Sequence, residues 1–218
     1  MKETIILVCG AFHYEWCWNE HFIPYFKEKG YNLHVHALSK EAKNLKDSMK
    51  ILRENIKKID TEFIFITHSM GNLFINEFLK TYKDCVPKSM VFLMPFPIEN
   101  RIKNLFFTNK NYIKLTREEF FFSGRVNNAK KYIDKMNKEP LSIRMLPVIY
   151  SSIKEIEFNV PILTIYSKND NCLLGESVME SAKLYKSKIV VLDDVCHDCM
   201  LDPEWKLVAD LTREFIDN

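Results

Sequence analysis

The stretch Glu62–Lys80, EFIFITHSMGNLFINEFLK, decides the fold. Its first half is a short run of apolar and β-branched residues, which is typical of a buried strand. Its second half has apolar residues at helical spacing, and this predicts an amphipathic helix over 71–82. Three residues join the two halves, so the chain must turn sharply. The turn places Ser69 at a helix N-terminus, where the helix dipole favours negative charge. The alternative is an ordinary strand–helix junction with a capping serine.

Short apolar runs of the same kind recur along the chain and alternate with helical patterns. Nearly continuous apolar character indicates strands that are covered on both faces. Alternation of strands and helices predicts an α/β fold with a mostly parallel sheet of about six strands, flanked by helices. The predicted strands are Thr4–Val8, Tyr31–Ala37, Glu62–Thr67, Ser89–Met94, Pro161–Tyr166 and Lys188–Leu192.

Four segments have helical patterns, and two of them carry end signals. Gly30 is suited to cap the C-terminus of the first helix. Asp202 is a candidate N-cap, with Pro203 at the first helical position of the last helix. The predicted helices are Cys17–Lys29, Asn44–Ile59, Gly71–Tyr82 and Pro203–Ile216.

The segment 95–159 breaks this rhythm. It shows no core strand and is rich in aromatic residues and lysines. Functional loops extend from strand ends, so we expect a small helical cap inserted over one end of the sheet. A longer crossover of two or three helices is the alternative. The length of 218 residues suits a single domain, 1–218, that contains this insertion.

Charge and composition exclude several classes of protein. Lys and Arg number 31 and Asp and Glu 29, a net charge of +2, whereas a dedicated nucleic-acid binder has a strong basic excess. The first apolar run, Ile5–Val8, is too short for a signal peptide or a transmembrane segment. Six cysteines are too few for a disulfide scaffold, so a reducing, cytoplasmic location is expected.

The residues Thr67-His68-Ser69-Met70-Gly71 resemble the G-x-S-x-G nucleophile elbow of the α/β-hydrolase superfamily. Small residues are wanted on either side of the nucleophile because strand and helix crowd together there. Gly71 meets this need, and Thr67 replaces the usual glycine. The resemblance implies the α/β-hydrolase fold, with Ser69 as nucleophile. A serine nucleophile excludes the members that use an aspartate, such as epoxide hydrolases and haloalkane dehalogenases.

In this superfamily an acid and then a histidine follow the serine. Asp170 follows the strand Pro161–Tyr166 and fits the acid position, although Asn-Asp-Asn is also common turn chemistry. His197 follows the last strand and precedes the last helix, which is the position of the base. Val195-Cys196 stand where relatives often have a glycine-rich approach. The alternative acids are Asp193, Asp194 and Glu176, and the other histidines, at 13, 21, 34, 36 and 68, suit the role less well.

The segment CGAFHYEWCW, from Cys9 to Trp18, resembles the H-G-x-x-x-x-x-W-x-W segment of esterase-like and hydroxynitrile-lyase-like members. Cys9 replaces the usual histidine. The resemblance implies an oxyanion hole formed by the backbone N–H groups of Phe12 and Met70. The alternative is a plain glycine turn beside buried tryptophans.

The sequence Cys196-His197-Asp198-Cys199 also permits a redox pair or half of a metal site. A reactive thiol needs a lowered pKa, and the neighbouring carboxylates favour the opposite. A structural zinc site commonly needs a second C-x-x-C pair, and the sequence has none. We therefore expect buried free cysteines, and no cofactor or metal.

These residues together favour a serine hydrolase that cleaves carboxylic esters through Ser69, His197 and Asp170. The expected partner is a small-molecule ester or thioester, and the oligomeric state stays open. Aromatic residues of the cap suggest an apolar acyl pocket, although packing explains them equally well. Three alternatives remain: a thioesterase or acyl-lipid hydrolase, a hydroxynitrile-lyase-like enzyme, and a non-catalytic ligand binder on the same fold.

Overall fold

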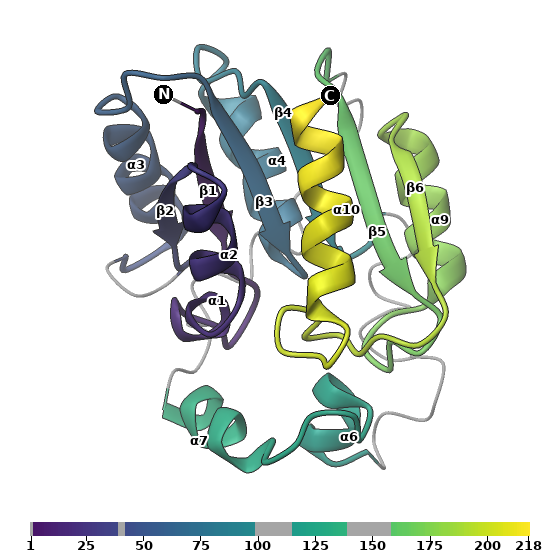
Figure 1. The fold of residues 1–218 in the computed structure, drawn as a ribbon. Helices are drawn as coiled ribbons and strands as arrows, with labels where there is room; N and C mark the ends of the chain where they lie inside the picture. The colour runs from purple at the N-terminus through teal and green to yellow at the C-terminus, as the bar shows by residue number, and fades with distance from the viewer. Residues whose placement is uncertain (1, 39–41, 99–114, 139–157) are drawn as a thin grey trace.

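The computed structural model describes residues 2–38, 42–98, 115–138 and 158–218. Six parallel strands form one sheet in the order β2-β1-β3-β4-β5-β6 (Figure 1). All six predicted strands are confirmed, with ends that differ by at most one residue. The strands are β1 Thr4–Val8, β2 Asn32–His36, β3 Phe63–His68, β4 Ser89–Leu93, β5 Ile162–Ser167 and β6 Lys188–Leu192.

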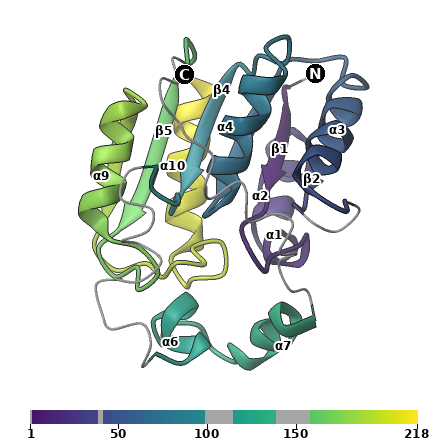
Figure 2. The ribbon, with the colours of Figure 1, turned by 180° about the vertical axis from the view of Figure 1, so that it is seen from behind.

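The four central strands are buried along their whole length, whereas the edge strands β2 and β6 are partly exposed. Helices α2 (Phe22–Glu28) and α10 (Trp205–Asp217) cover one face of the sheet. Helices α3 (Leu45–Ile56), α4 (Gly71–Thr81) and α9 (Gly175–Leu184) cover the other (Figures 1 and 2). Burial on both faces explains the uninterrupted apolar runs of the central strands.

Three of the predicted helices differ from the structure. The predicted helix Asn44–Ile59 ends three residues early, at Ile56. The segment predicted as one helix, Cys17–Lys29, forms α1 (Trp16–Asn19) and α2, separated at Glu20 and His21. Glu20 contacts the Tyr132 hydroxyl and the His21 ring stacks on Trp205, so side-chain contacts outside the helix fix the break.

The last helix begins at Trp205 rather than at Pro203. The Asp202 carboxylate accepts hydrogen bonds from the amides of Cys196 and Glu204 and from the Arg125 guanidinium. Asp202 therefore organises the loop before the helix instead of acting as the expected N-cap. Helix α9, between β5 and β6, was not among the predicted helices.

Two helices of the segment 95–159 lie beyond the carboxyl ends of the strands (Figures 1 and 2). They are α6 (Arg117–Phe122), which begins with a capping box formed by Thr116 and Glu119, and α7 (Lys130–Lys138). Within the expected cap, residues 99–114 and 139–157 lie outside the described residues. None of the helices in the described ranges is long and apolar enough to cross a membrane.

Candidate active site

Ser69 occupies the sharp turn between β3 and α4, with φ of 48°. A left-handed conformation is costly for a residue with a Cβ and persists only where its surroundings impose it. The next strand supplies that constraint. The Ser69 amide donates to the Leu93 carbonyl (3.1 Å), and the Ser69 carbonyl accepts from the Phe96 amide (3.2 Å). The turn is therefore held from both sides of its peptide.

Two glycines allow the chain to pack closely around this turn. A Cβ on Gly10 would lie 2.9 Å from Ser69 Cβ, and a Cβ on Gly71 would lie 3.0 Å from the Cys9 carbonyl oxygen. Real Cβ atoms essentially never approach other atoms more closely than about 3 Å, so a Cβ at Gly10 would force a shift, and a Cβ at Gly71 would fit only if the neighbouring backbone yielded by a few tenths of an ångström. Thr67, at the position where relatives have a third glycine, is fully buried inside β3.

Asp170 and His197 are brought together by the loops that follow β5 and β6. Asp170 Oδ1 accepts from the Cys172 amide (2.7 Å), and Oδ2 accepts from His197 Nδ1–H (2.8 Å). Both side chains are almost fully buried. A carboxylate held in this way fixes the orientation of the imidazole and leaves Nε2 as its remaining nitrogen.

The pKa of His197 is raised above 6.5. Burial, the largest influence, lowers the pKa, but the attraction of the Asp170 charge and the hydrogen bond that His197 donates to Asp170, with a further contribution from the Asp198 charge, outweigh burial. The carboxylate therefore stabilises the cationic form of the imidazole.

His68 connects the turn of Ser69 to the loop of His197. Its Nε2–H donates to the His197 carbonyl oxygen at 3.1 Å, and the two rings lie 4.8 Å apart. Burial, followed by the nearby His197 and His13, lowers the pKa of His68 well below 6.5, so the ring is neutral. Within the described residues, the Ser69 hydroxyl makes no hydrogen bond in this structure. A catalytic hydrogen bond between a nucleophile and its base is often long in the absence of substrate and tightens only when substrate binds.

The approach to His197 is held by hydrogen bonds where relatives often have glycine. The Val195 amide donates to Ser167 Oγ (3.0 Å), and the Cys196 amide donates to Asp202 Oδ2 (2.8 Å). The Arg125 guanidinium donates two hydrogen bonds to the same carboxylate, from Nε to Oδ2 at 2.7 Å and from Nη2 to Oδ1 at 3.1 Å. A partly buried, bidentate ion pair thus joins the segment after α6 to the histidine loop.

Helix α6 also packs on the site. The Phe121 ring lies 6.0 Å from the His197 ring and 6.4 Å from the Phe12 ring, and its carbonyl accepts from the Asp198 amide (3.1 Å). Cys172 and Asn171 of the acid loop donate to carbonyl oxygens of α6 as well. These contacts make α6 a fixed wall of the site.

The loop after β1 forms a tight turn in which the His13 amide donates to the Gly10 carbonyl at 3.4 Å. Phe12 lies in this turn with φ of 66°. Within the described residues, neither the Phe12 amide nor the Met70 amide donates to a backbone carbonyl. Both amides belong to turns that border Ser69, the first across Gly10 and the second as the next residue.

Two residues of this region were missed from sequence. The sequence favours His197 over His13 as the base, and it indicates Asp198 only as a carboxylate beside the cysteines. In the structure His13 Nε2 lies 2.8 Å from Asp198 Oδ2, with both side chains buried. They are 185 positions apart, so no local pattern could have revealed the pair.

The structure confirms the expectation of buried, free cysteines. Burial, and then the carboxylates of Asp202 and Asp198, raise the pKa values of Cys196 and Cys199 well above 9.0. Thiols in this state are poor nucleophiles. Trp16 and Trp18 are buried, as expected for the alternative packing role of the tryptophans.

Two groups of three side chains hold potential metal-ligand atoms within 4.8 Å of one another: Asp170, Cys172 and His197, and His13, His68 and Asp198. In each group a histidine and a carboxylate meet at 2.8 Å, the length of a hydrogen bond, which engages the atoms that a metal would need. The distances fit two histidine–carboxylate hydrogen bonds, one between His197 and Asp170 and one between His13 and Asp198.

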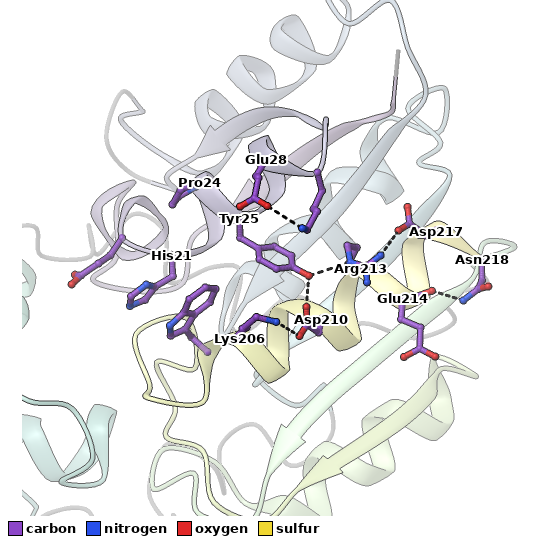
Figure 3. A pocket seen from close by; sticks show the side chains of 13 residues that line it. His21, Pro24, Tyr25, Glu28, Lys206, Asp210, Arg213, Glu214, Asp217 and Asn218 are labelled. Carbon is purple, nitrogen blue, oxygen red and sulfur yellow. Dashed lines mark hydrogen bonds and ion pairs between the residues drawn. The ribbon is translucent and has the colours of Figure 1, made fainter.

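A groove of about 1100 Å³ lies between α2 and α10, as Figure 3 shows. Its walls are mostly charged, with Tyr25 bonded to Asp210 and Arg213 across it. Neither Ser69, Asp170 nor His197 lines it, so this groove is separate from the candidate active site.

The sequence matches no known family profile. No curated protein matches it either. Solved structures do match over the whole chain. A polyneuridine aldehyde esterase has 15% identity and a TM-score of 0.71, with 100% of both chains covered. A hydrolase from Oleispira antarctica has 14% identity and a TM-score of 0.72, with 100% of this chain and 92% of that chain covered. A bromoperoxidase from Bacillus anthracis has 15% identity and a TM-score of 0.72, with 100% of this chain and 93% of that chain covered.

Likeness at this low identity concerns the fold, and the matching structures share one architecture. The six-stranded parallel sheet, flanked by helices on both faces, agrees with it. The fold expected from the residues around Ser69 is thereby confirmed: the chain has the α/β-hydrolase fold.

Proposed function

We propose that this chain is a serine hydrolase that cleaves carboxylic esters, with Ser69 as nucleophile, His197 as base and Asp170 as the orienting acid. One observation carries the proposal. His197 is paired with the buried Asp170, and the backbone of the His197 loop is hydrogen-bonded to His68, the residue directly before the strained turn of Ser69. A serine hydroxyl needs a base oriented by a third group, and these residues provide that set.

In the proposed reaction, Asp170 holds the proton on His197 Nδ1, so Nε2 is free to accept the proton of Ser69 Oγ. The serine oxygen attacks the ester carbonyl, and the leaving alcohol takes the proton back from Nε2. Water then attacks the acyl-enzyme, again losing a proton to Nε2, and releases the carboxylic acid. The Asp170 carboxylate stabilises the imidazolium in both steps.

The negative charge on the carbonyl oxygen would be bound by the amides of Phe12 and Met70. The Met70 amide lies at the N-terminus of α4, where the helix dipole adds to the attraction. Each of these turns borders Ser69, and neither amide donates to a described backbone carbonyl. Loss of one such donor typically costs about two to three orders of magnitude in turnover.

Matching structures described as an esterase, hydrolases and a pyrethroid hydrolase support hydrolysis of a small-molecule substrate. A fold alone does not fix the reaction, so the support comes from the site. The apolar contacts that α6 makes beside His197, through Phe121, favour an ester with an apolar acyl or alcohol group.

The test is labelling with a fluorophosphonate followed by peptide mass spectrometry. We expect modification at Ser69 in the wild type and none in Ser69→Ala or His197→Ala. Ser187→Ala and His21→Ala, which change a serine and a histidine outside the site, should label normally. Absence of labelling, together with no hydrolysis of p-nitrophenyl acetate, would refute the proposal. Acyl-CoA thioesters and a cyanohydrin in the same assays separate thioesterase and lyase activity from ester cleavage.

A further inference from the structure

The side chain of His13 has a hydrogen-bond acceptor at each of its two nitrogens. The Ala11 carbonyl oxygen lies 2.6 Å from Nδ1, and Asp198 Oδ2 lies 2.8 Å from Nε2. The His13 side chain is 1% exposed and that of Asp198 is fully buried. An arrangement this enclosed is maintained only if its polar atoms are bonded to one another.

The position of one proton follows from the partners. A carbonyl oxygen can only accept, so His13 Nδ1 must carry hydrogen and donate to Ala11. A second proton lies between Nε2 and the Asp198 carboxyl group, on one atom or the other. In both cases Nδ1 is the donor to Ala11, and the contact of Asp198 with Nε2 holds the ring in the orientation for that bond.

This bond determines the orientation of the peptide between Ala11 and Phe12. The described residues contain no cis peptide bond, and in a trans peptide the C=O and N–H groups point in opposite directions. Holding the Ala11 carbonyl on the His13 side therefore directs the Phe12 N–H to the other side. Phe12 has φ of 66°, a conformation that costs about 1–2 kcal/mol for a residue with a Cβ. The His13 bond stabilises that conformation.

Asp198 couples this turn to the rest of the site. It follows His197 directly, its amide donates to the Phe121 carbonyl, and its Oδ1 lies 3.8 Å from His68 Nε2. Within the described residues, Oδ1 has no hydrogen-bond partner. The loop that carries the proposed base is thus bonded through one side chain to the turn that carries the proposed oxyanion donor.

We propose that His13, oriented by Asp198, is a positioning residue that holds the Ala11–Phe12 peptide with its N–H group directed at the oxyanion. The inference rests on the proposed function of Ser69 and Phe12. His13 touches no reacting atom, and its effect on turnover passes through the backbone of Phe12.

Two variants of His13 separate the two hydrogen bonds. The amide nitrogen of asparagine is bonded to Cγ, as Nδ1 is, so His13→Asn can still donate to Ala11. The amide nitrogen of glutamine reaches the position of Nε2, so His13→Gln keeps the contact with Asp198 and loses the bond to Ala11. We expect kcat for p-nitrophenyl acetate to fall at least tenfold in His13→Gln, with KM within about threefold of wild type. His13→Asn should keep kcat within about threefold.

Equal losses of kcat in the two folded variants, or an unchanged kcat in His13→Gln, would overturn the inference. Thermal unfolding checks that both variants fold. If the buried carboxylate unfolds His13→Asn, the double variant His13→Asn, Asp198→Asn takes its place, because it contains no uncompensated charge. An arylboronic acid, which forms a tetrahedral anion on a serine, should lose affinity for His13→Gln in proportion to kcat/KM.

A measurement independent of activity distinguishes failure of this inference from failure of the proposed function. The ¹H–¹⁵N resonance of the Phe12 amide should shift in His13→Gln and remain near its wild-type position in His13→Asn. If the wild type neither labels at Ser69 nor binds the boronic acid while this pattern holds, the proposed function is wrong and the peptide orientation stands. If the Phe12 resonance responds equally to both substitutions, the orientation itself is wrong.

Discussion

His197 Nδ1 lies 2.8 Å from Asp170 Oδ2, in a contact from which solvent is almost excluded. Asp170 raises the pKa of His197 above 6.5 against the opposing influence of burial. The proposed base acts only when neutral, so activity should be low at acid pH and increase as the pH passes this raised pKa. We expect the acid limb of kcat/KM to have a midpoint above 6.5, measured with p-nitrophenyl acetate between pH 5 and 9.

Asp170→Asn tests the cause of that midpoint. Without the carboxylate, burial dominates and lowers the pKa of His197, so the acid limb should move to lower pH. The maximum rate should fall by about three to four orders of magnitude, because the imidazole loses its orienting partner. An acid limb that stays in place in Asp170→Asn would show that another group titrates.

Arg125 and Asp202 form the ion pair that holds the amide of Cys196, directly before His197. Removal of the guanidinium leaves a buried carboxylate without its main partner. Arg125→Ala should therefore lower the free energy of unfolding by about 3 kcal/mol, measured by urea denaturation at pH 7. Arg125→Lys should recover only part of this, since lysine cannot form the bidentate ion pair.

The pair of Lys168 and Asp193 is the matched control, because both side chains are largely exposed. Lys168→Ala should leave stability unchanged within error, since exposed ion pairs contribute little. Equal effects of Arg125→Ala and Lys168→Ala would mean that the bidentate ion pair does not organise the histidine loop.

Gly10 borders Ser69 so closely that a methyl group cannot be accommodated without movement. In Gly10→Ala the added Cβ would meet Ser69 Cβ at 2.9 Å and displace the nucleophile or the oxyanion turn. We expect kcat to fall at least tenfold, since small displacements of reacting groups are costly.

Gly124→Ala provides the comparison for this substitution. Gly124 has φ of 70° and open space around its Cα, so alanine there is strained but touches nothing. The change should cost about 1 kcal/mol of stability and leave kcat unchanged. A similar loss of kcat in both alanine variants would refute the steric explanation for Gly10.

The sheet was predictable because each strand is short, apolar and buried on both faces. The break at Glu20 and His21 was not, because it depends on Tyr132 and Trp205, more than 100 residues away. Asp202 shows the same limit. Its position directly before Pro203 is typical of an N-cap, but its carboxylate accepts hydrogen bonds from Arg125 and from the amide of Cys196.

At the site, the prediction of Asp170 and His197 came from the motif around Ser69 and from the order in which acid and base follow it. The structure brings these two residues into hydrogen-bond contact. These predictions depend on local patterns at strand ends. The pair of His13 and Asp198 has no such pattern, since it forms only when the first and last loops of the sheet meet. Long-range polar pairs of this kind require the folded structure.

Cys196 and Cys199 should be unreactive in the folded protein, because burial and the nearby carboxylates raise their pKa values well above 9.0. At pH 8 we expect iodoacetamide to leave both thiols unmodified in the native state and to alkylate both in urea. The double variant Cys196→Ala, Cys199→Ala should retain activity. Rapid native alkylation, or loss of activity without loss of fold, would restore a chemical role for the pair.

Thr67 stands where relatives of the elbow have glycine, and its hydroxyl is buried without a hydrogen-bond partner among the described residues. Valine has nearly the same shape and no polar atom to desolvate. Thr67→Val should therefore raise the free energy of unfolding by up to about 1 kcal/mol, measured by urea denaturation. Thr164→Val is the control, because that hydroxyl is bonded to Ser187 Oγ (2.9 Å) and its loss should destabilise the protein. If Thr67→Val destabilises as much as Thr164→Val, the Thr67 hydroxyl has a bonding partner, such as an internal water molecule, and threonine is required at this turn for its polarity.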